Sequence, residues 1–180
     1  DNDVVLLSPT GSGKTLAFLL PVLLTLRTES GIQTLIFVPS RELALQIDSV
    51  FKSMNTSRKT CCRYGGHPIS EEKKSIVGNR PAIIIGTPGR IADHLRKGNF
   101  SPLTIQTLVI DEFDKSLELG FQDEMEEIVA QLGGLKKRML MSATDAEEIP
   151  RFTGLHQTIK LNFLHANSQE QSRLQIRKLY

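Results

Sequence analysis

Short apolar runs alternate with helical patterns along this chain, and that alternation limits the possible folds more than any other feature. Four runs rich in apolar, mostly β-branched residues are each followed by a segment with helical periodicity. The runs occupy residues 3–8, 34–38, 82–86 and 107–111, and the helical segments occupy 13–28, 40–54, 88–98 and 121–132. Because the runs are continuously apolar, they are typical of parallel strands buried on both faces. The sequence therefore predicts an α/β fold with a mostly parallel central sheet flanked by helices on both faces.

Further strands are expected at 59–65, 138–143 and 158–163.

Length, charge and composition limit the functions that this fold can have. A chain of 180 residues suffices for one domain with a substantial core. Its 22 basic and 20 acidic residues leave a net charge of only +2, so a nucleic acid would have to be bound by a local site. The longest apolar patch contains Pro21 and is too short to span a membrane. Cys61 and Cys62 are adjacent, which excludes an ordinary disulfide between them and favours a core strand in a reducing compartment.

The loop after the first strand has the composition of a phosphate-binding loop. In an open parallel sheet, ligands bind at the carboxyl ends of the strands. Residues 8–15 read SPTGSGKT and match the P-loop pattern, except that a serine stands at the position of its first glycine. Gly11 and Gly13 would let backbone N–H groups turn onto phosphate oxygens at the start of a helix. Lys14 would reach the β- and γ-phosphates, and the Thr15 hydroxyl would bind Mg²⁺. The alternative is a flexible turn with a solvated lysine. The predicted nucleotide-binding residues are Ser8, Pro9, Thr10, Gly11, Ser12, Gly13, Lys14 and Thr15.

The strand near residue 107 runs directly into a cluster of carboxylates, in the sequence TLVIDEFDKS. The magnesium ion of a bound nucleotide requires a carboxylate at the end of a strand near the P-loop, and Asp111 has that position. Glu112 could then orient or deprotonate the attacking water. A solvated acidic turn is the alternative, although buried strands rarely end in unpaired carboxylates. The two loops together predict ATP and Mg²⁺ as ligands, with Lys14, Asp111 and Glu112 as catalytic residues and Thr15 and Asp111 as metal ligands. A transporter ATPase, a recombinase and a helicase are all compatible with these two loops.

Four further motifs narrow the choice of reaction: PSRELA at 39–44, GG at 65–66, TPGR at 87–90 and SAT at 142–144. In order and spacing, these motifs, the P-loop and the DEFD tetrad resemble the first RecA-like domain of DEAD-box RNA helicases, over nearly the whole chain. The resemblance implies a RecA-like P-loop NTPase fold and an ATP-dependent RNA helicase with RNA-stimulated ATP hydrolysis that locally unwinds or remodels RNA. It also implies that the P-loop, the tetrad and SAT serve ATP and its coupling, whereas the other three motifs bind the RNA backbone. The implied RNA-binding residues are Pro39, Ser40, Arg41, Gly65, Gly66, Thr87, Pro88, Gly89 and Arg90.

These residue types suit the roles that the resemblance implies. Ser40 and Thr87 are favourable N-cap residues and Pro88 suits the first helical position, so both loops are predicted to present helix N-termini to phosphates. Arg41 and Arg90 would add positive charge there, or either could instead brace a loop by pairing with an acid. The glycine pair would let a backbone approach closely, or would form a simple turn. Such contacts read phosphate and sugar, so RNA binding is expected to be independent of base sequence.

Asp114 resembles the last member of the family's tetrad, which bonds to the SAT loop. Ser142 or Thr144 is therefore its expected partner, and these three residues are implied to couple the γ-phosphate site to domain closure. A helix cap is the alternative role for Asp114. Phe113 departs from the family, which has alanine at this position. We predict that its ring packs under the SAT loop with little effect on ATP chemistry.

The resemblance also implies a larger parent protein. Residues 1–164 are predicted as the RecA-like helicase ATP-binding domain, and 165–180 as a linker and the start of a second RecA-like domain. The chain starts at Asp1, at its first strand and without an initiating Met, so we expect the adenine-recognising glutamine motif of the family to lie upstream. The second domain would supply arginine fingers, which contribute roughly 10³ to 10⁵ in rate, so the fragment alone is expected to hydrolyse little ATP. The expected partners are single-stranded or duplex RNA and that second domain, and no membrane is expected. The expected location is the cytoplasm or, in a eukaryote, also the nucleus or nucleolus.

Two other functions stay open, namely a DNA helicase of the same superfamily and a non-catalytic RNA clamp on an inactive ATPase fold. The intact P-loop lysine and tetrad carboxylates argue against the clamp. The acidic stretch at 123–127 has helical spacing and predicts a solvated helix face. Four histidines at no ligand spacing predict neither a zinc site nor a catalytic triad, namely His67, His94, His156 and His165.

Overall fold

A computed structural model gives the fold of the chain, and it describes residues 2–28, 31–66, 68–145 and 149–164. Seven strands form one sheet in the order β3-β4-β2-β5-β6-β1-β7, and every pair of neighbours is parallel. In chain order the elements are β1 (Val4–Leu7), α1 (Lys14–Thr25), β2 (Thr34–Phe37), α2 (Arg41–Ser53), β3 (Thr60–Arg63), α3 (Ile69–Asn79), β4 (Ile83–Gly86), α4 (Pro88–Arg96), η1 (Pro102–Thr104), β5 (Thr107–Ile110), α5 (Phe113–Glu118), α6 (Gln122–Gln131), β6 (Lys137–Ser142), η2 (Arg151–Thr153) and β7 (Ile159–Asn162).

The predicted parallel α/β fold is confirmed, and all seven predicted strands are present. Helices α1, α2, α4 and α6 also lie within the predicted helical segments. Two helices were not predicted. The first is α3, which carries mostly polar side chains, and the second is α5, which has only 6 residues and begins inside the carboxylate cluster. The predicted linker at 165–180 lies outside the described residues.

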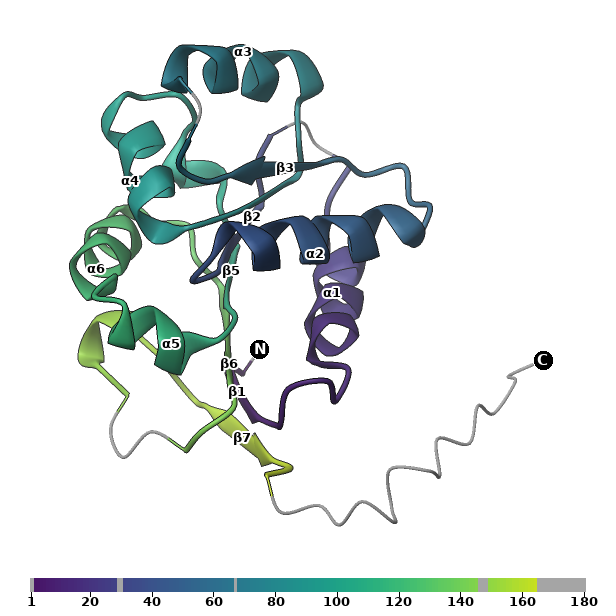
Figure 1. The fold of residues 1–180 in the computed structure, drawn as a ribbon, viewed down its shortest axis with the longest axis vertical. Coiled ribbons are helices and arrows are strands. Elements are labelled where there is room, and N and C mark those ends of the chain that lie inside the picture. The colour runs from purple at the N-terminus through teal and green to yellow at the C-terminus, as the bar shows by residue number, and fades with distance from the viewer. Residues whose placement is uncertain (1, 29–30, 67, 146–148, 165–180) are drawn as a thin grey trace.

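The core consists of two apolar layers, one on each face of the sheet. Alternate residues of each strand enter opposite layers, as the two-residue period of a strand requires. In β2, Leu35 and Phe37 join the layer under α4, α5 and α6, whereas Ile36 joins the layer under α1 and α2. Figure 1 shows these two groups of helices on opposite sides of the sheet. This double coverage explains why the strands read as continuous apolar runs.

The strand order places the predicted site loops together. Strand β6 lies between β1 and β5, so the loops after these three strands are neighbours at the carboxyl edge of the sheet. These loops are the P-loop, the SAT loop and the tetrad. Strands β2, β4 and β3 follow on the other side of β5, and their carboxyl ends carry the three motifs assigned to RNA.

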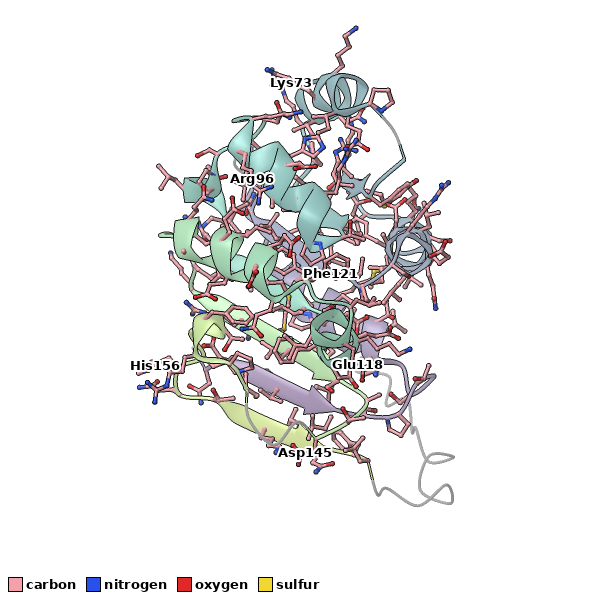
Figure 2. The ribbon with its side chains drawn as sticks, turned by 60° about the vertical axis from the view of Figure 1, so that its left-hand side comes forward. Lys73, Arg96, Glu118, Phe121, Asp145 and His156 are labelled. Carbon is pink, nitrogen blue, oxygen red and sulfur yellow. The ribbon has the colours of Figure 1, made fainter. Side chains whose placement is uncertain are left out.

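Helices α4 and α6 pack side by side over one face of the sheet, as Figure 2 shows from a second direction. An exposed ion pair between Arg96 of α4 and Glu127 of α6 joins them. The pair uses one carboxylate of the acidic stretch that we predicted to be a solvated helix face, while Met125 in the same stretch is buried. Among the helices that the structure describes, none is both long and apolar enough to cross a membrane.

Candidate functional site

The P-loop presents an uncapped helix N-terminus to solvent. Gly11 and Gly13 have φ angles of +82° and +89°, in the left-handed region that favours glycine. A Cβ atom at either position would meet nothing within 4 Å, so the backbone conformation, not space, requires glycine here. Helix α1 begins at Lys14, as predicted, and no side chain caps its first N–H groups. These groups and the positive end of the helix dipole are thus available to an anion.

Lys14 and Asp111 come from distant parts of the sequence and lie close enough to interact electrostatically. The Lys14 ammonium is buried and has no hydrogen-bond partner among the described residues. Asp111 is only 3% exposed, and burial raises the pKa of its carboxyl from 3.8 to about 6. The nearby Lys14 charge lowers the pKa of Asp111 and opposes that rise, as does the backbone N–H of Glu112. The P-loop lysine and the strand-end aspartate thus lie near each other, and their joint role at a nucleotide stays a prediction.

Glu112 has a strained backbone at the start of α5. Its φ and ψ angles are 47° and 53°, in the left-handed region that non-glycine residues rarely adopt. The backbone N–H of Glu112 donates to Asp111 Oδ1 at 3.0 Å, which closes the turn between the two carboxylates. The Glu112 carboxylate lies 3.7 Å from Lys115 Nζ. Strain of this kind costs about 1–3 kcal/mol and is concentrated at functional sites, so it supports a functional role for this turn.

The SAT loop joins the tetrad to the P-loop. The Thr144 hydroxyl donates to Asp114 Oδ2 at 2.9 Å, so of the two partners predicted for Asp114 the structure selects Thr144. Ser142 instead holds the SAT loop itself, because its hydroxyl donates to Thr144 O and accepts from Thr144 N. The Ser8 backbone N–H donates to Ser142 O at 3.0 Å, which fastens the P-loop to the same loop. Asp114 Oδ1 is buried without a hydrogen-bond partner in the described part of the chain.

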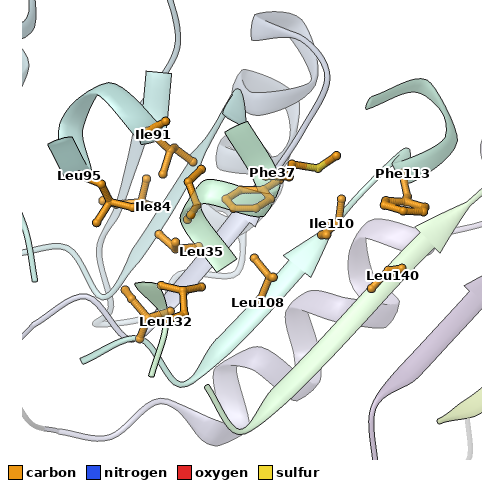
Figure 3. Packing of buried hydrophobic residues seen from close by; sticks show 14 of the residues in the cluster. Leu35, Phe37, Ile84, Ile91, Leu95, Leu108, Ile110, Phe113, Leu132 and Leu140 are labelled. Atoms are coloured by element: carbon orange, nitrogen blue, oxygen red, sulfur yellow. The ribbon is translucent and has the colours of Figure 1, made fainter. Parts of the chain in front are cut away.

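Phe113 is a buried core residue. Its side chain is 2% exposed and belongs to the layer under α4, α5 and α6. Figure 3 shows the ring beside Ile110 and Leu140, and Leu140 belongs to the strand that leads into the SAT loop. The ring therefore has an apolar place next to that strand, and the small effect of Phe113 on ATP chemistry stays a prediction.

A pocket of about 240 Å³ opens at the P-loop. Ser8, Gly13 and Lys14 line it together with Phe163, which follows β7. Ser8 replaces the first glycine of the P-loop pattern and is itself buried, with its hydroxyl bonded to the Ser12 hydroxyl. Phe163 was not among the predicted site residues, because only the pairing of β7 with β1 brings residue 163 beside the P-loop.

The motif PSRELA forms the predicted helix N-terminus after β2. Ser40 is the N-cap of α2, and its hydroxyl accepts a hydrogen bond from Leu43 N at 3.2 Å. Arg41 is exposed, and its guanidinium lies 4.9 Å from the centre of the Tyr64 ring. Pro39 is buried under this loop. The cation–π contact links the loop after β2 with the residue that precedes the glycine pair.

The glycine pair lies in an exposed turn after β3. Gly66 has a φ of +105°, which a residue with a side chain rarely adopts, whereas Gly65 has no such requirement. Both glycines are exposed, and a Cβ atom at either would meet no atom within 4 Å. The turn therefore offers bare backbone to a ligand.

The motif TPGR begins α4. Pro88 occupies the first turn as predicted, and Thr87 holds the N-cap position, but the Thr87 side chain makes no capping hydrogen bond. Gly89 and Arg90 lie in the first turn, and Arg90 Nε donates to Glu72 Oε2 at 2.9 Å. The side chains of Arg90 and Glu72 are only 11% and 10% exposed. The structure therefore favours the alternative in which this arginine braces its loop by pairing with an acid.

Sequence reasoning did not find the polar residues that surround Arg90. Glu72 also bonds His94 Nε2 at 2.6 Å, and His94 Nδ1 lies 2.9 Å from Asn99 Nδ2. The four-residue spacing between Arg90 and His94 on α4 was a usable signal, because residues four apart share a helix face. Glu72 gave no such signal, since α3 itself was not predicted.

Within the described part of the chain, the remaining polar groups show no sign of a further reactive or metal site. Burial raises the pKa of the Cys62 thiol to about 12, which keeps it protonated and unreactive at neutral pH. Over the described ranges, no three His, Cys, Asp or Glu side chains gather as a metal-binding group would.

Comparison with known proteins agrees with the resemblance to DEAD-box RNA helicases found in the sequence. Residues 1–152 match the family model described as DEAD/DEAH box helicase. The chain is 38% identical over 169 residues to the DEAD-box ATP-dependent RNA helicase RhpA of Helicobacter pylori, which covers 92% of this chain and 34% of that protein. It is 40% identical over 155 residues to the ATP-dependent RNA helicase HAS1 of Chaetomium globosum, covering 82% of this chain and 26% of that protein.

Solved structures agree. The crystal structure of a DEAD box protein from the hyperthermophile Methanococcus jannaschii matches with a TM-score of 0.83 at 31% identity, over 90% of this chain and 45% of that one. A hypothetical ATP-dependent RNA helicase from Sulfolobus tokodaii matches with a TM-score of 0.79 at 31% identity, over 89% of this chain and 48% of that one. The chain thus spans about a third of the first of these curated relatives and less than half of either solved chain. With the P-loop, the tetrad and the SAT loop joined at one edge of a parallel sheet, and with 152 residues matched by the family model, the chain belongs to the DEAD/DEAH box helicase family and has its RecA-like fold.

Proposed function

We propose that this chain is the ATP-binding part of a DEAD-box RNA helicase that hydrolyses ATP to unwind or remodel RNA locally. The observation that carries the proposal is the buried Lys14 ammonium, which has no hydrogen-bond partner among the described residues and acts electrostatically on the buried carboxyl of Asp111. A buried cation without a hydrogen bond is costly unless a ligand completes it. A triphosphate at the P-loop would provide that ligand.

The residues present fit ATP and Mg²⁺. The uncapped N–H groups at the start of α1 and the Lys14 ammonium would hold the phosphates. The Thr15 hydroxyl and the Asp111 carboxylate would hold Mg²⁺, which when bound neutralises the charge that develops on the phosphate oxygens. The raised pKa of Asp111 describes the chain without a cation, and a nearby cation would favour its ionised form.

The tetrad residues would divide the work of hydrolysis. Glu112 stands at the strained turn after Asp111 and would orient the attacking water or accept its proton. Asp114 and Thr144, joined by their hydrogen bond, would transmit the state of the phosphate site to the SAT loop. The side chain of Ser142 would keep that loop in its bent form.

The RNA backbone would lie across the ends of β2, β3 and β4. The loops at 39–41, 65–66 and 87–90 offer two helix N-termini and an exposed glycine turn at the same edge of the sheet. Such groups recognise phosphate and sugar without reading bases. A second RecA-like domain of the parent protein would complete the RNA and ATP sites, and the 180 residues alone would then hydrolyse little ATP.

Substitution of Glu112 in the full-length parent protein tests this proposal. RNA-stimulated ATP hydrolysis should fall by about a hundredfold or more in Glu112→Gln, whereas ATP and RNA binding should persist. Glu118→Gln provides a matched control, because Glu118 is exposed on the same short helix. RNA and DNA strands of equal length should be compared in the same assay, since a DNA helicase would not prefer the 2′-hydroxyl. Retained hydrolysis in Glu112→Gln, or a wild-type enzyme that RNA does not stimulate, would refute the proposal.

A further inference from the structure

A cluster of buried polar side chains connects two of the three loops proposed to contact RNA. It contains Arg63 at the end of β3, Glu72 on α3, Arg90 and His94 on α4, and Asn99 after α4. Glu72, Arg63, His94 and Asn99 are all less than 9% exposed. None of these four was predicted as a site residue from the sequence.

Glu72 is the centre of this cluster. One carboxylate oxygen, Oε2, lies 2.9 Å from Arg90 Nε and 2.6 Å from His94 Nε2. The backbone oxygen of Glu72 accepts a second contact, from a terminal nitrogen of Arg63 at 3.1 Å. Helix α3 is thus fastened to both β3 and α4. Strand β3 and helix α3 flank the glycine turn, and α4 begins with TPGR.

His94 acts in this cluster as a neutral hydrogen-bond donor. Its ring is fully buried, and burial lowers its pKa, so the neutral ring predominates at neutral pH. With the Asn99 amide donating to Nδ1, the ring proton is on Nε2 and is donated to Glu72. The imidazole is therefore fixed on both sides, and it holds the Glu72 carboxylate against Arg90.

The backbone reinforces the same connection. Thr87 N donates to Arg63 O at 3.0 Å, and a Cβ atom at Gly86 would lie only 2.0 Å from that oxygen. The glycine turn and the TPGR loop therefore leave the sheet side by side, from paired strands β3 and β4. Arg63 and Arg90 stand at these two exits and both bond Glu72, so the cluster can set the distance between the two loops.

We propose that Glu72 and His94 are positioning residues for RNA-backbone recognition, because together they hold Arg90 and thus the first turn of α4 at a fixed place beside the glycine turn. This inference rests on the proposed function. A strand of fixed phosphate spacing binds more tightly to two loops whose separation is set in advance, since less ordering is required on binding. Neither residue needs to touch the RNA for this effect.

The test is a set of variants in the full-length parent protein, assayed by RNA-stimulated ATP hydrolysis. Glu72→Ala removes the contact to Arg90, and His94→Leu removes the hydrogen bond that holds Glu72 in place. Glu72→Gln keeps an acceptor oxygen, and His94→Gln keeps a donor. We expect the RNA concentration for half-maximal stimulation to rise about tenfold in Glu72→Ala and His94→Leu. Residues that hydrogen-bond to metal ligands without touching the metal have effects of about this size on metal affinity. The KM for ATP and the kcat at saturating RNA should stay within about twofold of the wild type, because the ATP site is not altered. The two conservative variants should recover most of the RNA affinity.

Glu127→Gln is the matched control, because the Arg96–Glu127 pair also fastens α4 but is exposed and lies at the last residue of that helix, whereas TPGR forms its first turn. If Glu72→Ala does not fold, His94→Leu still decides the question, since it removes a neutral group and leaves the Glu72–Arg90 ion pair in place. Thermal stability that falls without any change in the half-saturating RNA concentration would overturn the inference while leaving the proposed function intact. A wild-type protein that RNA does not stimulate would overturn both.

Discussion

The proposed nucleotide edge consists of the P-loop, the tetrad and the SAT loop, and the proposed RNA-facing loops are 39–41, 65–66 and 87–90. Both lie at the carboxyl edge of one sheet, but they differ in whether their buried charged groups are paired. At the nucleotide edge, Lys14 Nζ and Asp114 Oδ1 are buried without hydrogen-bond partners in the described part of the chain, and burial raises the pKa of Asp111. At the RNA-facing loops, Arg90 is paired with Glu72, and Glu72 in turn with His94. In the first region a buried ammonium has no hydrogen-bond partner among the described residues, whereas in the second the Arg90 and Glu72 charges compensate each other within the protein.

This difference indicates two kinds of recognition. A site with uncompensated charges is less stable when empty and gains most from a ligand whose charges meet them, which suits a single nucleotide in a defined position. A region whose charges are already paired gains less from each contact and presents a rigid backbone, which suits a polymer held at many weak points. Substitutions of the unpaired charges should therefore change ligand affinity more than stability, whereas substitutions of the paired charges should change stability more than ligand affinity.

The largest expected effect on stability comes from Arg90→Ala. Removal of one partner from a buried ion pair leaves the Glu72 carboxylate uncompensated, so the free energy of unfolding should fall by about 3 kcal/mol. Urea denaturation of the 180-residue chain at pH 7.5 measures this change. Arg96→Ala is the control, because its pair with Glu127 is exposed to solvent and should contribute much less to stability. Equal losses in the two variants would contradict the distinction between a braced loop and a surface pair.

Lys14→Ala should change ATP affinity much more than it changes stability. ATP affinity should fall by about a hundredfold, or about 2.7 kcal/mol, because a charge-assisted contact to phosphate is lost. The nucleotide-free chain should lose no stability and should become slightly more stable, since the buried ammonium has no hydrogen bond to lose within the described residues. Equilibrium binding of a fluorescent ATP analogue and urea denaturation measure the two quantities. Lys115→Ala, which alters an exposed lysine near Glu112, should retain ATP affinity.

Asp111→Asn should stabilise the chain by an amount that depends on pH. In the unfolded chain the pKa of Asp111 is near 3.8, and in the folded chain it is about 6. Between these values the folded protein keeps a proton that the unfolded chain loses, so wild-type stability falls as pH rises through this window. The variant does not titrate there and should exceed the wild type by about 3 kcal/mol at pH 7.5, with most of the gain lost at pH 4. Denaturation curves at both pH values, without nucleotide or Mg²⁺, provide the check, and a gain that does not change with pH would refute the assigned pKa shift.

The smallest expected difference separates two helix N-termini that look alike in sequence. Ser40→Ala should cost about 1 kcal/mol of stability, because the hydroxyl accepts from Leu43 N. Thr87→Ala should cost much less, since the Thr87 side chain makes no capping bond. Thermal denaturation of the two variants decides this point. If Thr87 instead uses its hydroxyl for RNA, its variant should lose RNA affinity in the parent protein while Tm stays unchanged.

Much of the fold and of the nucleotide site could be predicted because its signals are local. The apolar runs predict the strands, the Gly11 and Gly13 conformations follow from the P-loop pattern, and Ser40 and Pro88 are typical of helix starts. The helices α3 and α5 could not be predicted in the same way, because one is mostly polar and the other is very short. Because α3 was not predicted, Glu72 could not be placed, and the burial of His94 beside it could not be explained from the sequence.

The sequence by itself determined the seven strands, four of the helices, the family and the candidate nucleotide-binding residues, since these depend on residue types at short spacing. Only the tertiary structure decided which of two partners Asp114 takes, that Arg90 braces its loop, and that Asp111 holds its proton more tightly than a solvated aspartate does. The physical reason is that hydrogen-bond partners and the burial of a charge are set by residues from distant strands and helices, which meet only when the sheet is assembled.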